Sequence, residues 1–114
     1  MQTYDYPKSN RLQKADDFSS VFNFRKSRTG TYFRIHYCPN TLQHSRLGLV
    51  VSKKVHKRAN KRNYMKRFLR EIFRQQQVEW QLGVDIVVRV VKCFTHDEFI
   101  IARNEFLELT KRFK

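Results

Sequence analysis

The first stretch of the chain with a helical pattern is ADDFSSVFNFRK. Phe18, Val21 and Phe22 recur there at positions i, i+3 and i+4, which places their side chains on one face of a helix. Asp16 or Asp17 stands just before this stripe, where a carboxylate can cap backbone N–H groups and interact favourably with the helix dipole. The pattern predicts a short amphipathic helix that begins at one of these two acids.

Two later stretches alternate between apolar and polar positions, as half-buried strands do. In TYFRIHYC, one face of the predicted strand carries Phe33, Ile35 and Tyr37, and the other carries Tyr32, Arg34 and His36. In RLGLVVS, the apolar face carries Leu47, Leu49 and Val51. The loop PNTLQHS separates the two stretches, so we expect a pair of antiparallel strands.

The stretch VDIVVRVVK is almost continuously apolar and β-branched, and only Asp85 and Arg89 interrupt it. Such a run indicates an interior strand that is covered on both faces. Thr95 and Glu98 follow at the spacing of a capping box, which predicts the start of a closing helix. The apolar positions of that helix are Phe99, Ala102, Phe106, Leu109 and Phe113.

Between these strands lies the segment 58–74, RANKRNYMKRFLREIFR, which also has helical spacing. Its apolar residues fall within one arc of a helix. They are Met65, Phe68, Leu69, Ile72 and Phe73. The other side carries Asn63, Lys66, Arg67, Arg70 and Arg74, and Arg62 lies at the border, from which we expect its guanidinium to extend outward.

The predicted order is helix, two antiparallel strands, helix, strand, helix. The middle helix has to carry the chain between two strands that we expect to be parallel, which is a βαβ crossover. We therefore predict a small α+β protein, a two-layer sandwich with one sheet. Its 114 residues fit a single domain, in which we expect residues 1–10 to form a loosely ordered tail.

The net charge of +14 is concentrated in one part of the chain. Residues 53–74 hold ten Lys and Arg against one acid, Glu71. A positive potential on one face usually serves a polyanionic partner, so nucleic acid is the leading candidate and a membrane surface is the second. No uncharged stretch approaches the length of a spanning helix, which disfavours the membrane.

A solvated helix face that happens to be basic is the alternative explanation. It is less favoured, because like charges at i and i+4, such as Lys66 and Arg70, repel each other. Asn63 adds to the functional explanation, since its amide can bond base edges or sugar hydroxyls beside cations that bind phosphates. The pattern favours a nucleic-acid-binding helix.

Groups for catalysis or metal binding are not evident in the sequence. The four histidines are scattered, no pair of carboxylates has a useful spacing, and Cys38 and Cys93 fit no metal motif. We expect both cysteines to be reduced core thiols. The N-terminal residues lack the apolar run of a secretory signal, so we expect a cytoplasmic protein.

The stretch RLGLVVSKKVHKRANKRNYMKRFLREIFR strongly resembles the signature of the bacterial ribonuclease P protein subunit family. That family has an Arg-Leu/Val-Gly strand, then Ser-Lys-Lys, then Arg-Asn-x-x-Lys-Arg-x-x-Arg on a helix. The matching residues are Arg46, Gly48, Ser52, Lys53, Lys54, Arg62, Asn63, Lys66, Arg67 and Arg70. The resemblance extends to Arg11-Leu12, DDFSSVF and DIVV. There are two departures: Tyr64 stands where the family often has Arg, and Val55-His56 stands where many members have Gly.

The resemblance implies an αβββαβα order, with an additional edge strand near residues 25–28 and a left-handed crossover. It implies the non-catalytic protein subunit of an RNA-catalysed endoribonuclease, which binds the RNA subunit and the 5′ leader of precursor tRNA. Mg²⁺ is expected at the active site of the RNA subunit, where it activates water. No metal on the protein, no membrane and no small-molecule substrate are implied. The alternative is a ribosomal-type structural RNA-binding protein, which would share the charge but not the signature.

The resemblance also implies two binding surfaces. The surface toward the RNA subunit comprises Lys53, Lys54, Arg58, Arg62, Asn63, Lys66, Arg67 and Arg70. A cleft between the first helix and the sheet would take the single-stranded leader, with Arg11, Phe18 and Phe22. To these, strand alternation adds Tyr32, Arg34, His36 and Arg89. For Phe18 and Phe22, packing in the core is the alternative role.

Overall fold

The computed structural model describes residues 11–12, 14–40, 42, 44–80 and 83–113, so the predicted tail at residues 1–10 lies outside the described residues. Three helices and four strands follow one another in the order αβββαβα that the resemblance implied, which is confirmed. They are α1 (Ala15–Phe24), β1 (Lys26–Thr29), β2 (Phe33–Pro39), β3 (Arg46–Val50), α2 (Ala59–Gln76), β4 (Val84–Val90) and α3 (Phe99–Thr110). Single 3₁₀ turns follow α2 and flank α3: η2 (Gln77–Glu79), η3 (His96–Glu98) and η4 (Lys111–Phe113).

The four strands form one mixed sheet in the order β1-β2-β4-β3. β2 pairs antiparallel with β1 and with β4, whereas β3 pairs parallel with β4. The two strands predicted as an antiparallel pair, β2 and β3, are therefore not neighbours, because β4 lies between them. The interior position predicted for β4 is confirmed, and β1 supplies the additional edge strand.

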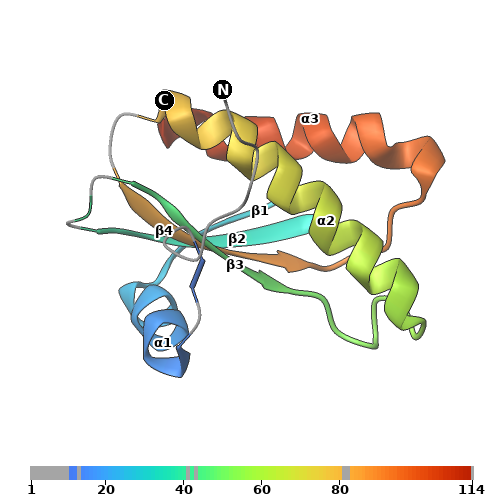
Figure 1. The fold of residues 1–114 in the computed structure, drawn as a ribbon, viewed down its shortest axis with the longest axis horizontal. Helices are drawn as coiled ribbons and strands as arrows, with labels where there is room; N and C mark the ends of the chain where they lie inside the picture. The colour runs from blue at the N-terminus through green and yellow to red at the C-terminus, as the bar shows by residue number, and fades with distance from the viewer. Residues whose placement is uncertain (1–10, 13, 41, 43, 81–82, 114) are drawn as a thin grey trace, which may run out of the picture.

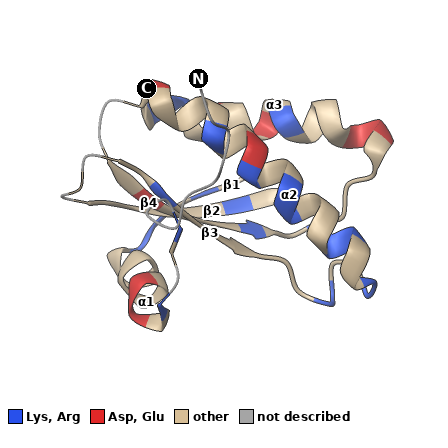
Figure 2. Cartoon of the chain, viewed as in Figure 1, with Lys and Arg blue, Asp and Glu red and all other residues tan. Residues whose placement is uncertain are grey.

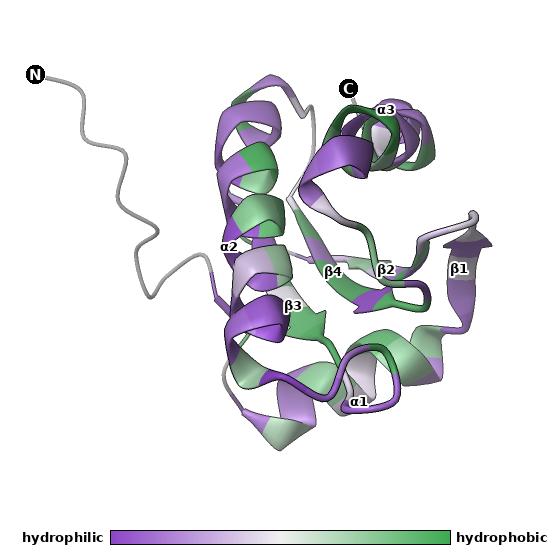
Figure 3. Cartoon of the chain, turned by 90° about the vertical axis from the view of Figure 1, so that its right-hand side faces the viewer, coloured by the Kyte–Doolittle hydropathy of each residue, from purple (hydrophilic) through white to green (hydrophobic). Residues whose placement is uncertain are grey.

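The crossover from β3 through α2 to β4 is left-handed. Seen from the side of α2 with β3 and β4 pointing upward, β4 lies to the left of β3 (Figures 1 and 3). Most crossovers between parallel strands are right-handed, so this crossover departs from the general rule. The left-handed crossover that the resemblance implied is confirmed.

The helices divide between the two faces of the sheet (Figure 1). α2 and α3 cover one face, and they turn hydrophobic residues toward each other above the sheet (Figure 3). The sheet with α2 and α3 encloses the main core, while α1 covers part of the opposite face with a small cluster built around Leu12, Val21 and Val87. Val87 contacts this small cluster and its neighbours Ile86 and Val88 contact the main core, so β4 is apolar on both faces.

The helix caps agree only partly with those predicted from the sequence. α1 begins at Ala15, with Lys14 as an N-cap that makes no side-chain bond, so the prediction that Asp16 or Asp17 caps the helix is wrong. Both acids lie in the first turn, where they still interact favourably with the helix dipole. The capping box of Thr95 and Glu98 is confirmed, and it opens the 3₁₀ turn that leads into α3.

Glu105 of α3 holds the turn between β1 and β2. Its carboxylate accepts hydrogen bonds from the backbone N–H groups of Thr31, Tyr32 and Phe33, at 2.8, 2.8 and 2.9 Å. A Cβ atom on Gly30 would lie 2.5 Å from Cδ of Glu105, so this approach requires a glycine. The last helix is thereby fixed to the first hairpin.

Candidate RNA-binding surfaces

α2 has a buried side and a cationic side. Its apolar stripe is buried as predicted, with Met65, Leu69, Ile72 and Phe73 inside and Phe68 partly buried. The opposite side carries Lys and Arg along the whole helix, with one acid between them (Figure 2). We call Asn63, Lys66, Arg67 and Arg70 of this side the α2 surface; all four are exposed or half-buried, and Arg74, which pairs with Glu71, is not included.

The turn before α2 places the other residues predicted for the RNA subunit. Lys53 and Lys54 are exposed between β3 and α2, and Arg58 is the N-cap residue of the helix. Arg62 does not extend outward as predicted. Its guanidinium donates to the carbonyl oxygens of His56 and Lys57, both at 2.9 Å, and so fixes the turn from which α2 starts.

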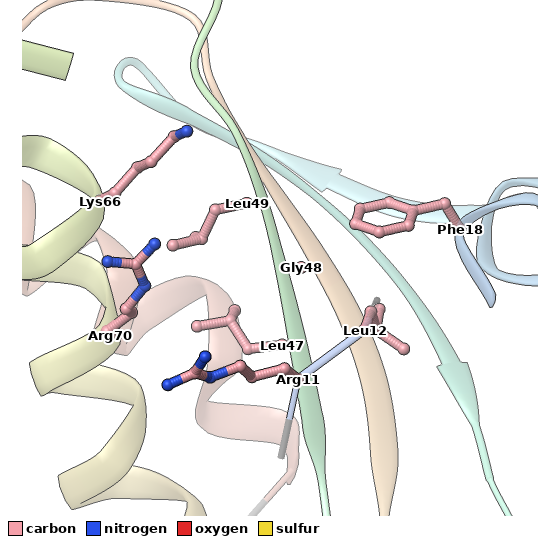
Figure 4. A pocket seen from close by; sticks show the side chains of 8 residues that line it. All are labelled: Arg11, Leu12, Phe18, Leu47, Gly48, Leu49, Lys66 and Arg70. Atoms are coloured by element: carbon pink, nitrogen blue, oxygen red, sulfur yellow. The ribbon is translucent and has the colours of Figure 1, made fainter. Parts of the chain in front are cut away.

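A hollow of about 360 Å³ lies between α2 and the outer edge of β3. Lys66 and Arg70 extend into it from α2, and Arg11 extends into it from the N-terminal segment (Figure 4). Leu47 and Leu49 form its apolar side. Three cations from two separate segments thus surround one space, an arrangement that suits phosphate groups.

Arg11 was predicted in the leader cleft, and it does line the same hollow as Phe18 of α1, together with Lys66 and Arg70 of α2. Arg11 forms a parallel bridge with Leu47, and the next residue, Leu12, donates its N–H to the carbonyl of Leu47 at 3.0 Å. This pairing along the edge of β3 turns the side chain of Arg11 toward Lys66 and Arg70 of α2 (Figure 4). Arg11 therefore lies beside both predicted surfaces, near Lys66 and Arg70 of α2 and in the same hollow as Phe18 of α1.

The second predicted surface lies where α1 covers the sheet. We call Phe18, Phe22, Arg34, His36 and Arg89 the α1 cleft, after the cleft that they were predicted to line. Phe22 is half-buried there, and its ring makes an edge contact with His36 at 4.8 Å between centroids. Phe18, one turn earlier, covers Gly48 of β3, where a Cβ atom would lie 2.6 Å from the ring. Both aromatic residues thus adjoin the small cluster under α1 while remaining partly accessible.

Arg34 and Arg89 stand directly opposite each other in the β2–β4 pair, and both are exposed. Like charges in opposite positions destabilise a sheet, so this pair is not explained by folding. They flank His36, whose pKa is held below its ordinary value of 6.5 by partial burial and then by the charges of Arg34 and Arg89. An anionic ligand would relieve the repulsion between the two arginines.

The shift at His36 has a defined consequence for stability. Because the folded pKa is lowered, the contribution of His36 is fully present above pH 6.5 and is lost as the pH falls through the folded pKa. The neutral imidazole is the form that the folded protein favours.

Tyr32 does not belong to the α1 cleft, so that prediction is wrong. Its side chain is buried in the main core on the side of α3, where its ring contacts Phe94 and its hydroxyl donates to Glu98 at 2.8 Å. β2 begins only at Phe33, so Tyr32 lies in the preceding turn and does not follow the alternation of the strand.

An ion-pair network that sequence reasoning did not identify holds α1 against the sheet. Arg46 of β3 donates to both carboxylate oxygens of Asp85 in β4, at 2.9 and 2.7 Å, and lies 3.7 Å from Asp17 of α1. Asn40 donates to the same Asp85 at 2.7 Å. Arg46 is thus a positioning residue of the α1 cleft, whereas the sequence showed it only as a residue of the family signature.

Two negative findings concern the parts of the chain that the structure describes. They contain no group of three or more His, Cys, Asp or Glu side chains that could hold a metal ion. Among their helices, none combines the length and the apolar character needed to cross a membrane.

A mixed sheet with a basic helix on one face and opposed arginines on the other defines a small α+β protein of the RNA-binding class. The family model for ribonuclease P matches residues 6–114. The chain therefore belongs to the ribonuclease P protein family.

Individual relatives agree with this assignment. The chain is 48% identical over 98 residues to the "Ribonuclease P protein component" of Chromobacterium violaceum, covering 86% of this chain and 80% of the relative. It is 37% identical over 114 residues to the protein of the same name from Thermotoga maritima, covering 96% and 97%.

Solved structures show the same fold. The Staphylococcus aureus RNase P protein aligns with a TM-score of 0.80 and 31% identity, over 94% of this chain and 100% of that chain. The Thermotoga maritima RNase P protein in complex with 1-(4-Fluorophenyl)-2-thiourea aligns with a TM-score of 0.77 and 35% identity, over 91% and 100%.

Proposed function

We propose that this chain binds the catalytic RNA subunit of ribonuclease P through the α2 surface and holds the 5′ leader of precursor tRNA in the α1 cleft. The observation that carries the proposal is the presence of cations on both faces of one sheet. α2 with Arg11 supplies those of one face, and the opposed pair Arg34 and Arg89 supplies those of the other. Two surfaces allow one small protein to contact two RNA molecules at once.

The assignment of one RNA to each surface follows from the side chains that the surface carries. The α2 surface offers Lys and Arg for phosphates and the amide of Asn63 for bases or sugars. The α1 cleft adds the half-buried ring of Phe22 to its arginines, and a ring beside cations suits a single strand whose bases can stack. Arg46, which binds Asp85 of the sheet and lies 3.7 Å from Asp17 of α1, helps to hold α1 beside the sheet.

Phosphodiester cleavage is assigned to the RNA subunit, where Mg²⁺ would activate the attacking water. The contribution of this chain is to bind and orient the two RNAs and to lower the repulsion between their phosphates. A ribosomal-type structural protein remains the alternative class, but the family assignment does not favour it.

Reconstitution tests this function. Protein freed of RNA should leave precursor tRNA uncut with or without Mg²⁺, and cleavage at the mature 5′ end should appear when a bacterial ribonuclease P RNA and Mg²⁺ are added. The measurement is the size of the cleavage products on a denaturing gel, with the RNA alone at low Mg²⁺ as the control. Cleavage by the RNA-free protein would overturn the RNA-catalysed mechanism.

A further inference from the structure

A second cavity, of about 380 Å³, lies on the other flank of α2 from the hollow at β3. Its walls come from the first turns of α2 and from the segment that joins β4 to α3. The lining residues are His56, Asn60, Lys61, Tyr64, Arg67, Cys93, Phe94, Thr95 and His96. A cavity of this size is within the range that takes a small organic ligand.

The lining combines three kinds of group. Lys61 and Arg67 are exposed cations at the rim, and no Asp or Glu is among the described residues that line the cavity. Tyr64 and Phe94 supply aromatic surface, since the ring of Tyr64 is half-buried and Phe94 closes the core beneath. Side chains that can donate and accept hydrogen bonds stand around them: Asn60, Thr95 and His96.

This combination fits a nucleotide better than the other ligands that a basic cavity could take. A metal ion is excluded among the described residues, which form no suitable donor group. A simple anion would use the two cations but not the aromatic wall. A nucleotide uses both, because its phosphate pairs with Lys or Arg and its base can stack on a ring.

The position of the cavity on α2 points to nucleic acid as the source of that nucleotide. At about 100° per residue, Tyr64 and Arg67 lie on one flank of the helix, and Lys66 and Arg70 lie on the other. Asn63 lies between the two flanks and is exposed. RNA that lies across α2 on Asn63 therefore has a cationic cavity on each side of its path.

We propose that the cavity beside Tyr64 takes one unpaired nucleotide of the RNA that lies on α2, with its phosphate at Lys61 and Arg67 and its base against the ring of Tyr64. The proposal rests on the proposed function, since that RNA is the RNA subunit of ribonuclease P. It also assigns a role to Tyr64, which stands where related sequences often have an arginine. A flat aromatic ring there replaces a charge with a stacking surface.

Crosslinking of the assembled ribonucleoprotein tests the position of the nucleotide. The full chain is bound to ribonuclease P RNA without precursor, irradiated with ultraviolet light and digested, and peptides that carry a nucleotide are identified by mass spectrometry. We expect adducts on peptides containing Tyr64 or Cys93. Cys38 is the matched control, because it is equally half-buried but lies at the α1 cleft, and it should carry none.

Two substitutions separate stacking from packing. Tyr64→Leu keeps apolar contact with the core but removes the ring, and it should weaken RNA binding about tenfold, within the range measured for base stacking. Tyr64→Phe keeps the ring and should bind as the unaltered protein does. The melting temperature of each free variant shows that it folds.

The outcomes distinguish the inference from the proposed function. If the RNA binds with adducts elsewhere on α2, none at Tyr64 or Cys93, and unchanged affinity for Tyr64→Leu, the cavity assignment is overturned and the function stands. Equal weakening in Tyr64→Phe and Tyr64→Leu would also overturn it, because stacking does not require the hydroxyl. If the unaltered protein fails to bind the RNA at all, the proposed function itself fails.

Discussion

Gly48 and Phe18 show at the scale of single residues how the α1 cleft is built. A side chain at position 48 would collide with the ring of Phe18, so the missing Cβ atom lets α1 approach β3 closely. The next aromatic residue on the same side of α1, Phe22, contacts His36 on β2. The two rings thus have different surroundings, with Phe18 against the backbone of the sheet and Phe22 beside the arginine pair.

Phe22 is the residue whose removal should affect the leader alone. Phe22→Ala should weaken binding of precursor tRNA to the assembled enzyme by about 1–3 kcal/mol, because one base loses its stacking partner. Mature tRNA has no leader, so its affinity should hardly change. The measurement is the ratio of the two affinities, with Phe24→Ala as the control, since Phe24 lies on the same helix and is 45% exposed.

Core packing is the competing role for Phe22, and it has a different signature. If Phe22 only packs, its removal should lower the melting temperature and leave the ratio of precursor to mature affinity as it was. That result would remove Phe22 from the leader cleft.

α2 shows at the scale of an element what the sequence could predict. Its buried stripe and its cations follow from helical periodicity, which depends only on residues a few positions apart. The buried face of β2 could be predicted for the same reason, from the alternation of Phe33, Ile35 and Tyr37, and all three are buried. Local patterns therefore predicted the helices, most of the strands and most of the α2 surface.

The features that the sequence could not show depend on pairing between distant segments. The opposition of Arg34 and Arg89 follows from the register of β2 against β4, and the position of Arg11 follows from its bridge to the edge of β3. Tyr32 was misplaced because the start of a strand cannot be fixed to one residue from alternation alone. Residue spacing within one element contains none of this information.

The α2 surface leads to a prediction about salt. Replacing Lys66 and Arg70 together with Ala should lower affinity for the RNA subunit and flatten the slope of log K against log salt by about one to two units. Binding isotherms over a series of salt concentrations measure that slope. The control is the double variant Lys26→Ala with Arg28→Ala, which removes two charges from the opposite edge of the sheet. An unchanged slope in the Lys66 and Arg70 variant would place the RNA subunit elsewhere.

At the scale of the whole molecule, Glu105 joins α3 to the first hairpin. One carboxylate of α3 binds three consecutive N–H groups at the turn between β1 and β2. Among the hydrogen bonds of the described residues, these three N–H groups have no other acceptor. The position of the first hairpin, and with it one side of the α1 cleft, therefore depends on the last helix.

Glu105→Ala should lower the free energy of unfolding by about 2–4 kcal/mol, because the donors lose a charged acceptor and two of them lie in partly buried surroundings. Glu108→Ala is the matched control on the same helix. Glu108 is exposed and pairs with Lys111 one turn away, so its loss should have little effect. Urea unfolding of both variants measures the difference, and equal stability of the two would contradict the role of Glu105.

The central position of β4 also determines when the sheet can form during synthesis. β1, β2 and β3 leave the ribosome before β4 does, yet β2 and β3 can only join through β4, which lies between them. Until residue 90 has emerged, the nascent chain holds a hairpin and an unpaired strand with open backbone edges. The strand that closes the sheet is the last of the four to be made, so the sheet should form only after residue 90 has left the ribosome.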